Sequence, residues 1–131
     1  MSDKLFRVLI VEDDPIAETI AAELLKHFHC TIDTAENPQQ ALEQVNSYYY
    51  DLIFMDIGLD GLDGFEVSER IRNNTDKNSS TPIVALTRYE GEDIEKRCHE
   101  LSMNGYLVKP MTFEKCRKVL DKFLAGEFWL T

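Results

Sequence analysis

Short apolar runs alternate along this chain with segments in which apolar residues recur every three or four positions. The runs predict five buried strands, at Leu5–Val11, Thr31–Ala35, Leu52–Met55, Pro82–Leu86 and Gly105–Val108. The segments between them predict helices, because apolar side chains at helical spacing form one face that packs against a sheet. Strand and helix thus alternate five times, which predicts an α/β fold: a doubly wound parallel sheet with helices on both faces.

Local signals mark several element boundaries. Residues that can cap a helix precede three of the expected helices, at Asp14, Asn37 and Thr112. Two further helices are expected at Phe65–Arg72 and Glu92–Met103. The glycine-rich segment Ile57–Gly64 is expected to be a loop, and the polar segment Asn73–Ser80 a flexible connection. The alternation continues past both, so the chain is expected to form a single domain with a core at about residues 5–125.

Composition narrows the possible functions. The 131 residues include 24 acidic and 14 basic ones, which gives a net charge of −10. This charge argues against nucleic-acid binding through the domain's own surface and against docking on anionic membrane. No apolar run approaches the roughly 20 residues of a membrane span, and the N-terminus lacks the apolar stretch of a secretion signal. Three widely spaced cysteines without a CxxC motif favour a reducing, cytoplasmic location.

The candidate chemistry lies where the expected strands end. Glu12 and Asp13 follow the first strand, Asp56 the third, Thr87 the fourth and Lys109 the fifth. Ligands of open α/β sheets bind at these carboxyl ends, so the five side chains should converge. Clustered carboxylates suit Mg²⁺, and a nearby lysine and hydroxyl suit phosphate oxygens. The set therefore indicates phosphoryl chemistry in which one aspartate can itself be the nucleophile.

Taken together, these motifs resemble the response-regulator receiver domain of two-component signalling, a CheY-like fold, over roughly residues 5 to 125. The matching segments are Val11–Asp14, Met55-Asp56, Leu62–Gly64, Leu86-Thr87 and Val108–Pro110. The resemblance implies that Asp56 accepts a phosphoryl group from phosphohistidine. It also implies that Glu12, Asp13, Asp56 and the backbone carbonyl of Gly58 hold Mg²⁺. As an isolated domain, such a protein catalyses only the phosphorylation and dephosphorylation of its own aspartate.

The same resemblance assigns a conformational switch. It implies that the Thr87 hydroxyl moves toward the phosphoryl group, that Lys109 pairs with that group, and that the ring of Tyr106 follows the shift. It further implies a cis peptide bond between Lys109 and Pro110, which proline makes accessible. In this family, the face built from the fourth helix, fifth strand and fifth helix serves partners and homodimers.

The parent protein and the partners follow from finer similarity. The segment Arg97–Gly105 is similar to the corresponding segment of receivers in hybrid sensor histidine kinases. This similarity favours a histidine kinase or a histidine phosphotransfer domain as the partner. It also allows the domain to be a cytoplasmic part of a membrane sensor kinase. A stand-alone response regulator is the alternative.

Two other classes of function are disfavoured. The intact acidic residues argue against an interaction module that is never phosphorylated. Glu12–Asp14 would repel a flavin phosphate, which argues against a flavodoxin-like cofactor binder.

Two positions depart from the family pattern. Asp60 occupies a place where many receivers carry proline, and Arg88 replaces the usual small residue after the switch hydroxyl. Arg88 and Tyr89 next to the site predict restricted access of water and a phosphoryl group that lasts for minutes or more.

Overall fold

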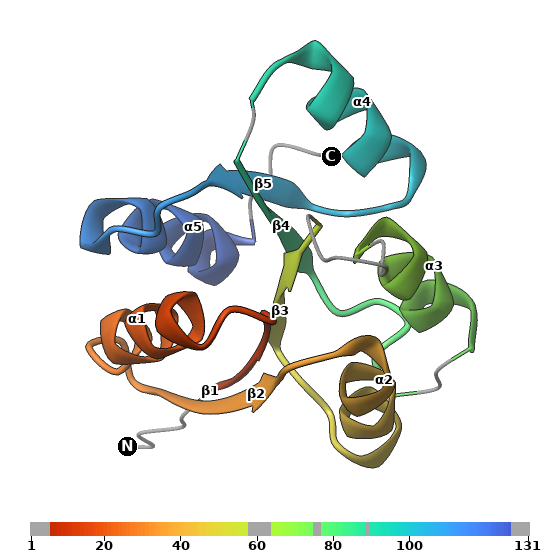
Figure 1. The fold of residues 1–131 in the computed structure, drawn as a ribbon, viewed down its shortest axis with the longest axis horizontal. Helices are drawn as coiled ribbons and strands as arrows, with labels where there is room; N and C mark the ends of the chain where they lie inside the picture. Colours follow the sequence, from red (N-terminus) through yellow and green to blue (C-terminus); the bar gives the residue numbers. More distant parts are fainter. Residues whose placement is uncertain (1–5, 58–63, 75–76, 89, 127–131) are drawn as a thin grey trace.

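Strands and helices alternate five times in the computed structural model, which describes residues 6–57, 64–74, 77–88 and 90–126. In chain order they are β1 (Phe6–Val11), α1 (Pro15–Leu25), β2 (Cys30–Ala35), α2 (Pro38–Ser47), β3 (Leu52–Asp56), α3 (Gly64–Asn74), β4 (Ile83–Thr87), α4 (Glu92–Glu100), β5 (Gly105–Val108) and α5 (Phe113–Ala125). The strands form one parallel sheet of order β2-β1-β3-β4-β5 (Figure 1). The predicted doubly wound α/β fold is confirmed.

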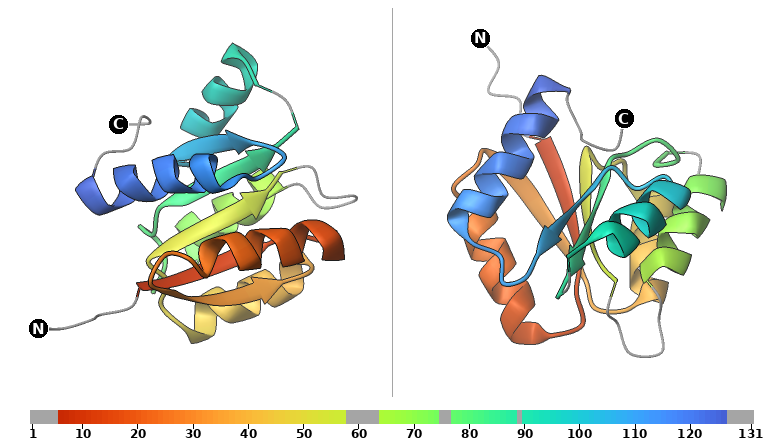
Figure 2. Two further views of the ribbon diagram at one scale, coloured as in Figure 1. Left: turned by 90° about the vertical axis from the view of Figure 1, so that its left-hand side faces the viewer. Right: turned by 90° about the horizontal axis from the view of Figure 1, so that it is seen from above.

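Alternate residues of the strands supply two separate cores. Val8 and Ile10 of β1 belong to a cluster with buried side chains of α1 and α5, whereas Leu9 and Val11 belong to one with α2, α3 and α4. Figure 2 shows α1 and α5 together on one face of the sheet. Burying both faces explains why β3 and β4 are buried along their whole length. No helix within the described ranges is long and apolar enough to cross a membrane.

The expected caps form. The Asp14 carboxylate accepts the Ile16 N–H at 3.0 Å, the Asn37 side chain accepts the Gln40 N–H at 2.8 Å, and the Thr112 hydroxyl accepts the Lys115 N–H at 3.2 Å. Each bond satisfies an N–H group that has no partner within its helix. Pro15 and Pro38 occupy first-turn positions, where the missing N–H costs nothing.

Helix α4 is shorter than predicted, since it ends at Glu100 rather than Met103. Ser102 adopts a left-handed conformation (φ 58°), the Met103 N–H bonds to the Cys98 carbonyl at 2.9 Å, and the Ser102 N–H bonds to the His99 carbonyl at 3.1 Å. These paired bonds close the helix and turn the chain toward β5. The apolar spacing continued to Met103 because that side chain is also buried, although outside the helix.

The polar segment 73–80, predicted as a flexible connection, is anchored where the structure describes it. Asn78 is fully buried; its amide donates to the Val45 and Tyr48 carbonyls at 2.6 and 2.8 Å, and its side-chain oxygen accepts the Tyr50 N–H at 2.8 Å. The Thr81 hydroxyl donates to the Tyr50 carbonyl at 2.9 Å. These bonds tie the start of β4 to the start of β3, at the end of the sheet opposite the candidate site.

Candidate functional site

Three carboxylates meet at the carboxyl ends of β1 and β3. Glu12 follows β1, and its N–H bonds to the Ala35 carbonyl at the end of β2 at 3.0 Å. Asp56 is the last residue of β3, and Asp13 is exposed at the rim. Carboxylate oxygens of Glu12, Asp13 and Asp56 all lie within 4.8 Å of one another. Because the strand order reverses between β1 and β3, the cluster occupies the topological switch point of the sheet.

Lys109 bridges two of these carboxylates. Its Nζ lies 2.9 Å from Asp56 Oδ2 and 2.9 Å from Glu12 Oε2, and the lysine side chain is only 19% exposed. The backbone places it there, since the Lys109 N–H bonds to the Thr87 carbonyl at 2.7 Å. The peptide bond between Lys109 and Pro110 is cis, as the sequence resemblance implied.

Burial and the neighbouring charges shift the pKa values of Glu12 and Lys109. Burial, followed by hydrogen bonding to Asp56, raises the pKa of Glu12 to about 7, although Lys109 acts in the opposite direction. Burial alone would lower the pKa of Lys109, but its bonds to Asp56 and Glu12 outweigh burial and raise that pKa. Glu12 and Asp56 therefore share the Lys109 ammonium, and the charged form of Glu12 is disfavoured in spite of this partner.

A cleft of about 600 Å³ contains this cluster. Thr87, 3% exposed at the end of β4, lines it together with Asp56 and Lys109. The apolar side chains in its lining are those of Ile57, Phe65 and Ile94. The cleft combines hard oxygen ligands, a cation and a hydroxyl, which is the chemistry that a divalent cation and a phosphoryl group require.

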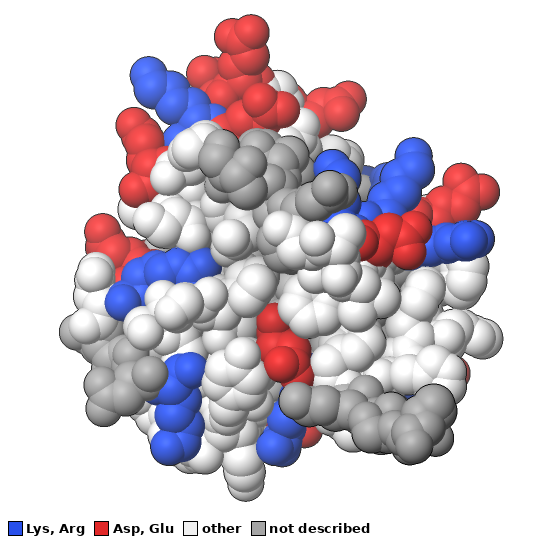
Figure 3. All heavy atoms as spheres, turned by 180° about the vertical axis from the view of Figure 1, so that it is seen from behind, with Lys and Arg blue, Asp and Glu red and all other residues white. Residues whose placement is uncertain are grey.

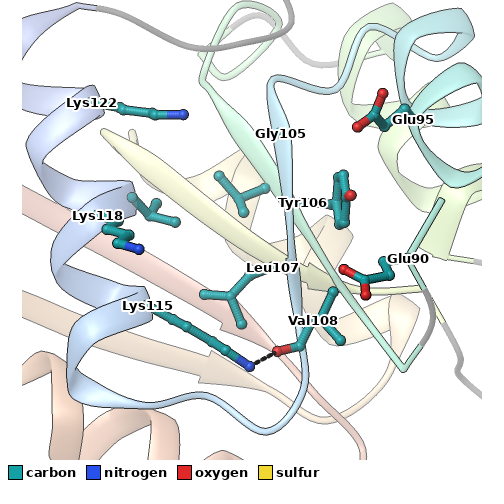
Figure 4. Close-up of a pocket in the computed structure, with 11 residues that line it drawn as sticks. Glu90, Glu95, Gly105, Tyr106, Leu107, Val108, Lys115, Lys118 and Lys122 are labelled. Atoms are coloured by element: carbon teal, nitrogen blue, oxygen red, sulfur yellow. Dashed lines mark hydrogen bonds between the residues drawn. The ribbon is translucent and has the colours of Figure 1, made fainter. Parts of the chain in front are cut away.

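Five of the predicted site residues come together in this way: Glu12, Asp13, Asp56, Thr87 and Lys109. Tyr106 does not line the cleft but a groove between α4 and α5 (Figure 4), where burial, then the charges of Glu95 and Glu90, raise the pKa of its hydroxyl. Gly58 lies outside the described residues, so its carbonyl remains a predicted metal ligand. Asp60 and Tyr89 also lie outside them.

Two contributions to the site are not apparent from the sequence. The apolar lining is one of them, because Ile57, Phe65 and Ile94 come from three separate segments of the chain. Gly64 was part of the Leu62–Gly64 motif but had no role; a Cβ at this position would collide with the Asp56 carbonyl oxygen. The start of α3 therefore approaches the end of β3 more closely than any side chain would permit.

The fold and the site together define the class of protein: a CheY-like doubly wound domain with an acidic cleft at the topological switch point of its sheet. The chain belongs to the response regulator receiver domain family, whose pattern it matches over residues 8–121. It is therefore a receiver domain of two-component signalling, and such domains interact with histidine kinases or phosphotransfer proteins.

Three relatives illustrate the family. The chain is 38% identical over 126 residues to the transcription factor SKN7 of Chaetomium thermophilum, covering 94% of this chain and 16% of that protein. It is 35% identical over 118 residues to hybrid signal transduction histidine kinase E of Dictyostelium discoideum, covering 88% of this chain and 7% of that protein. A solved structure of similar fold is the receiver domain of the sensor histidine kinase PA1611 from Pseudomonas aeruginosa, which has a magnesium ion coordinated in its active-site cleft. Its sequence is 27% identical and its TM-score is 0.81, and the match covers 93% of this chain and 99% of that one. The chain thus spans a small part of its curated relatives.

Proposed function

We propose that this receiver domain accepts a phosphoryl group on Asp56 from a phosphohistidine, with Mg²⁺ held by Glu12, Asp13, Asp56 and the Gly58 carbonyl. The observation that carries the proposal is the Lys109 ammonium, which lies 2.9 Å from both Asp56 and Glu12 inside the acidic cleft. The ammonium is placed to bind the oxygens of a phosphoryl group on Asp56, because a buried lysine attracts phosphoryl oxygens as well as carboxylates.

The acidic cluster fits a hard divalent cation. Its donors are carboxylate oxygens within 4.8 Å of one another, and burial together with the neighbouring Asp56 raises the pKa of Glu12 although Lys109 lowers it. Mg²⁺ prefers a site with few protein oxygens and keeps waters and phosphate oxygens in the remaining positions. When bound, the ion neutralises charge on the transferring phosphoryl group.

The transfer step uses Asp56 as the nucleophile. A carboxylate oxygen of Asp56 forms a bond to phosphorus while the phosphorus–nitrogen bond of phosphohistidine breaks, and the bonding pair remains on the imidazole nitrogen. Lys109 stabilises the charge on the phosphoryl oxygens, and the Thr87 hydroxyl donates a hydrogen bond to one of them. Hydrolysis reverses the modification when water attacks the phosphorus and the Asp56 carboxylate leaves.

Transmission of the signal would involve Thr87 and Tyr106. Thr87 lines the reaction cleft, and Tyr106 on β5 pairs in register with Ala85, two residues before Thr87. A movement of the Thr87 side chain toward the phosphoryl group would vacate space on the α4 side of the sheet. The ring of Tyr106, half-buried in the groove beside α4, is placed to respond.

The groove that contains Tyr106 is also the surface we propose for self-association. Figure 4 shows Lys115, Lys118 and Lys122 along its α5 wall, and Glu95 of α4 with Glu90 of the preceding connection on the opposite side. Figure 3 shows that acidic side chains gather over α4 at the top of the molecule. In a two-fold dimer, the basic wall of one copy would face the acidic wall of the other.

The parent protein is proposed from similarity alone. We infer that the domain is a single unit with a core at about residues 5–125, attached to a hybrid histidine kinase and located in the cytoplasm. Its phosphodonor would be the kinase itself or a histidine phosphotransfer domain. The stand-alone regulator is the alternative, since a transcription factor and a hybrid kinase are both among the relatives.

Mass spectrometry of the intact protein tests the proposed function. Incubation with Mg²⁺ and acetyl phosphate should add about 80 Da, the mass of one phosphoryl group. Asp56→Asn or a chelator should abolish the gain, whereas Asp51→Asn, which changes an aspartate at the opposite end of β3, should not. If no gain occurs with acetyl phosphate or with a phosphorylated phosphotransfer domain, the proposal is wrong and an unphosphorylated interaction module is favoured.

A further inference from the structure

Arg88 lies at the junction of two cavities. It directly follows Thr87 at the end of β4 and lines the reaction cleft. It also lines a smaller cavity of about 260 Å³ on the α1 side, together with Leu86, Ile20 and Met111. Both cavities share Glu12 and Lys109, so the Arg88 side chain stands at the border between the reacting groups and an apolar surface.

The guanidinium of Arg88 is available for a ligand. The side chain is exposed, and no carboxylate in the described part of the chain lies within ion-pair distance of it. This is notable in a cleft lined by four carboxylates, those of Glu12, Asp13, Asp14 and Asp56. Lys109, in contrast, is already engaged by Glu12 and Asp56.

Arrival of a phosphoryl group changes this balance of charge. Four carboxylates and two cations give the described lining of the cleft a formal charge of −2, which one Mg²⁺ would neutralise. Phosphorylation then replaces the single charge of Asp56 by the two charges of an acyl phosphate, and the excess negative charge is on the phosphoryl oxygens. Of the two cations among the described residues that line the cleft, Lys109 contacts two carboxylates, whereas Arg88 contacts none of the described ones.

We propose that Arg88 is a second cationic ligand of the phosphoryl group on Asp56, besides Lys109. An arginine presents planar, forked N–H donors that match two phosphoryl oxygens at once. Its aliphatic stem would lie along the apolar lining of the smaller cavity while the guanidinium covers the mouth of the cleft. The inference deepens the proposed function and rests on it, because it concerns how this chain holds the group that Asp56 accepts.

Binding of beryllium trifluoride, an anion that mimics a phosphoryl group on a carboxylate, tests the inference without turnover. Calorimetric titration of the Mg²⁺-saturated protein should show that Arg88→Ala weakens binding about tenfold, equivalent to about 1.4 kcal/mol. Arg88→Lys should give an intermediate loss, since it keeps the charge but not the fork. Arg117→Ala removes the same charge from an exposed position on α5 that lines neither cavity, and should bind like the unsubstituted protein.

The two proposals fail in different ways. If the unsubstituted protein binds the anion and Arg88→Ala binds it within twofold, Arg88 is not a ligand and only the inference is overturned. An equal loss in Arg88→Ala and Arg117→Ala would also overturn it, since the effect would be one of net charge. If the unsubstituted protein does not bind the anion, the proposed function fails and the inference with it.

Discussion

The stability of the protein without Mg²⁺ should depend on pH through Glu12. Burial and the neighbouring Asp56 raise the pKa of Glu12 from 4.5 to about 7. A carboxyl with a raised pKa in the folded state stabilises the fold fully below pH 4.5, and this contribution is lost as the pH rises through 7. At pH 8 the loss amounts to about 3 kcal/mol, and at pH 5 it is below about 1 kcal/mol, since one pH unit of difference corresponds to about 1.4 kcal/mol.

The variant Glu12→Gln isolates the contribution of Glu12 ionisation to the free energy of unfolding. The amide cannot ionise, so the variant should gain about 2 kcal/mol relative to the unsubstituted protein as the pH rises from 5 to 8. Comparing the two pH values removes any constant cost of the weakened contact with Lys109. Urea unfolding at both pH values, with chelator present, measures the difference, and Glu43→Gln at an exposed position on α2 serves as the control.

Addition of Mg²⁺ should reverse the comparison at pH 8. A bound cation favours the ionised carboxylate, so the unsubstituted protein should be stabilised and Glu12→Gln much less. A stability difference that stays constant between pH 5 and pH 8 without Mg²⁺ would mean that Glu12 has an ordinary pKa in the folded protein, contrary to this prediction.

Urea unfolding of three further variants tests the site cation, the buried anchor and a helix cap. Lys109→Ala removes the cation shared by Glu12 and Asp56 and should cost about 3 kcal/mol at pH 8 without Mg²⁺, with a smaller cost at pH 5; equal costs at both pH values would contradict the charge argument. Asn78→Ala should cost about 3 kcal/mol, because buried backbone groups lose their partners; a change below about 1 kcal/mol would show that the anchor is dispensable. Asp14→Ala removes the cap of α1 and should cost about 1 kcal/mol, whereas no measurable change would mean that solvent replaces the cap.

The convergence of the site residues could be predicted because it follows from the strand ends. Apolar runs locate those ends within a residue, and a parallel sheet brings them to one edge. Glu12, Asp56 and Lys109 therefore meet for reasons that the sequence displays. The bridging position of the Lys109 ammonium between two carboxylates depends on side-chain packing, which periodicity does not encode.

Other features could not be read from the pattern. Asn78 lies in a polar stretch that is typical of a mobile loop, yet its amide is buried because the starts of β3 and β4 need hydrogen-bond partners. The end of α4 was misplaced because Met103 continues the apolar spacing after Ser102 has turned the chain. In both cases tertiary packing, rather than local preference, determines the structure.

The site of phosphorylation, proposed to be Asp56, can be located directly. After incubation with Mg²⁺ and acetyl phosphate, borohydride reduces an aspartyl phosphate to homoserine, which peptide mass spectrometry locates. We predict homoserine at position 56, dependent on Mg²⁺, with every other aspartate unchanged. Homoserine at another aspartate instead, or a phosphoryl group on a different type of residue, would contradict it.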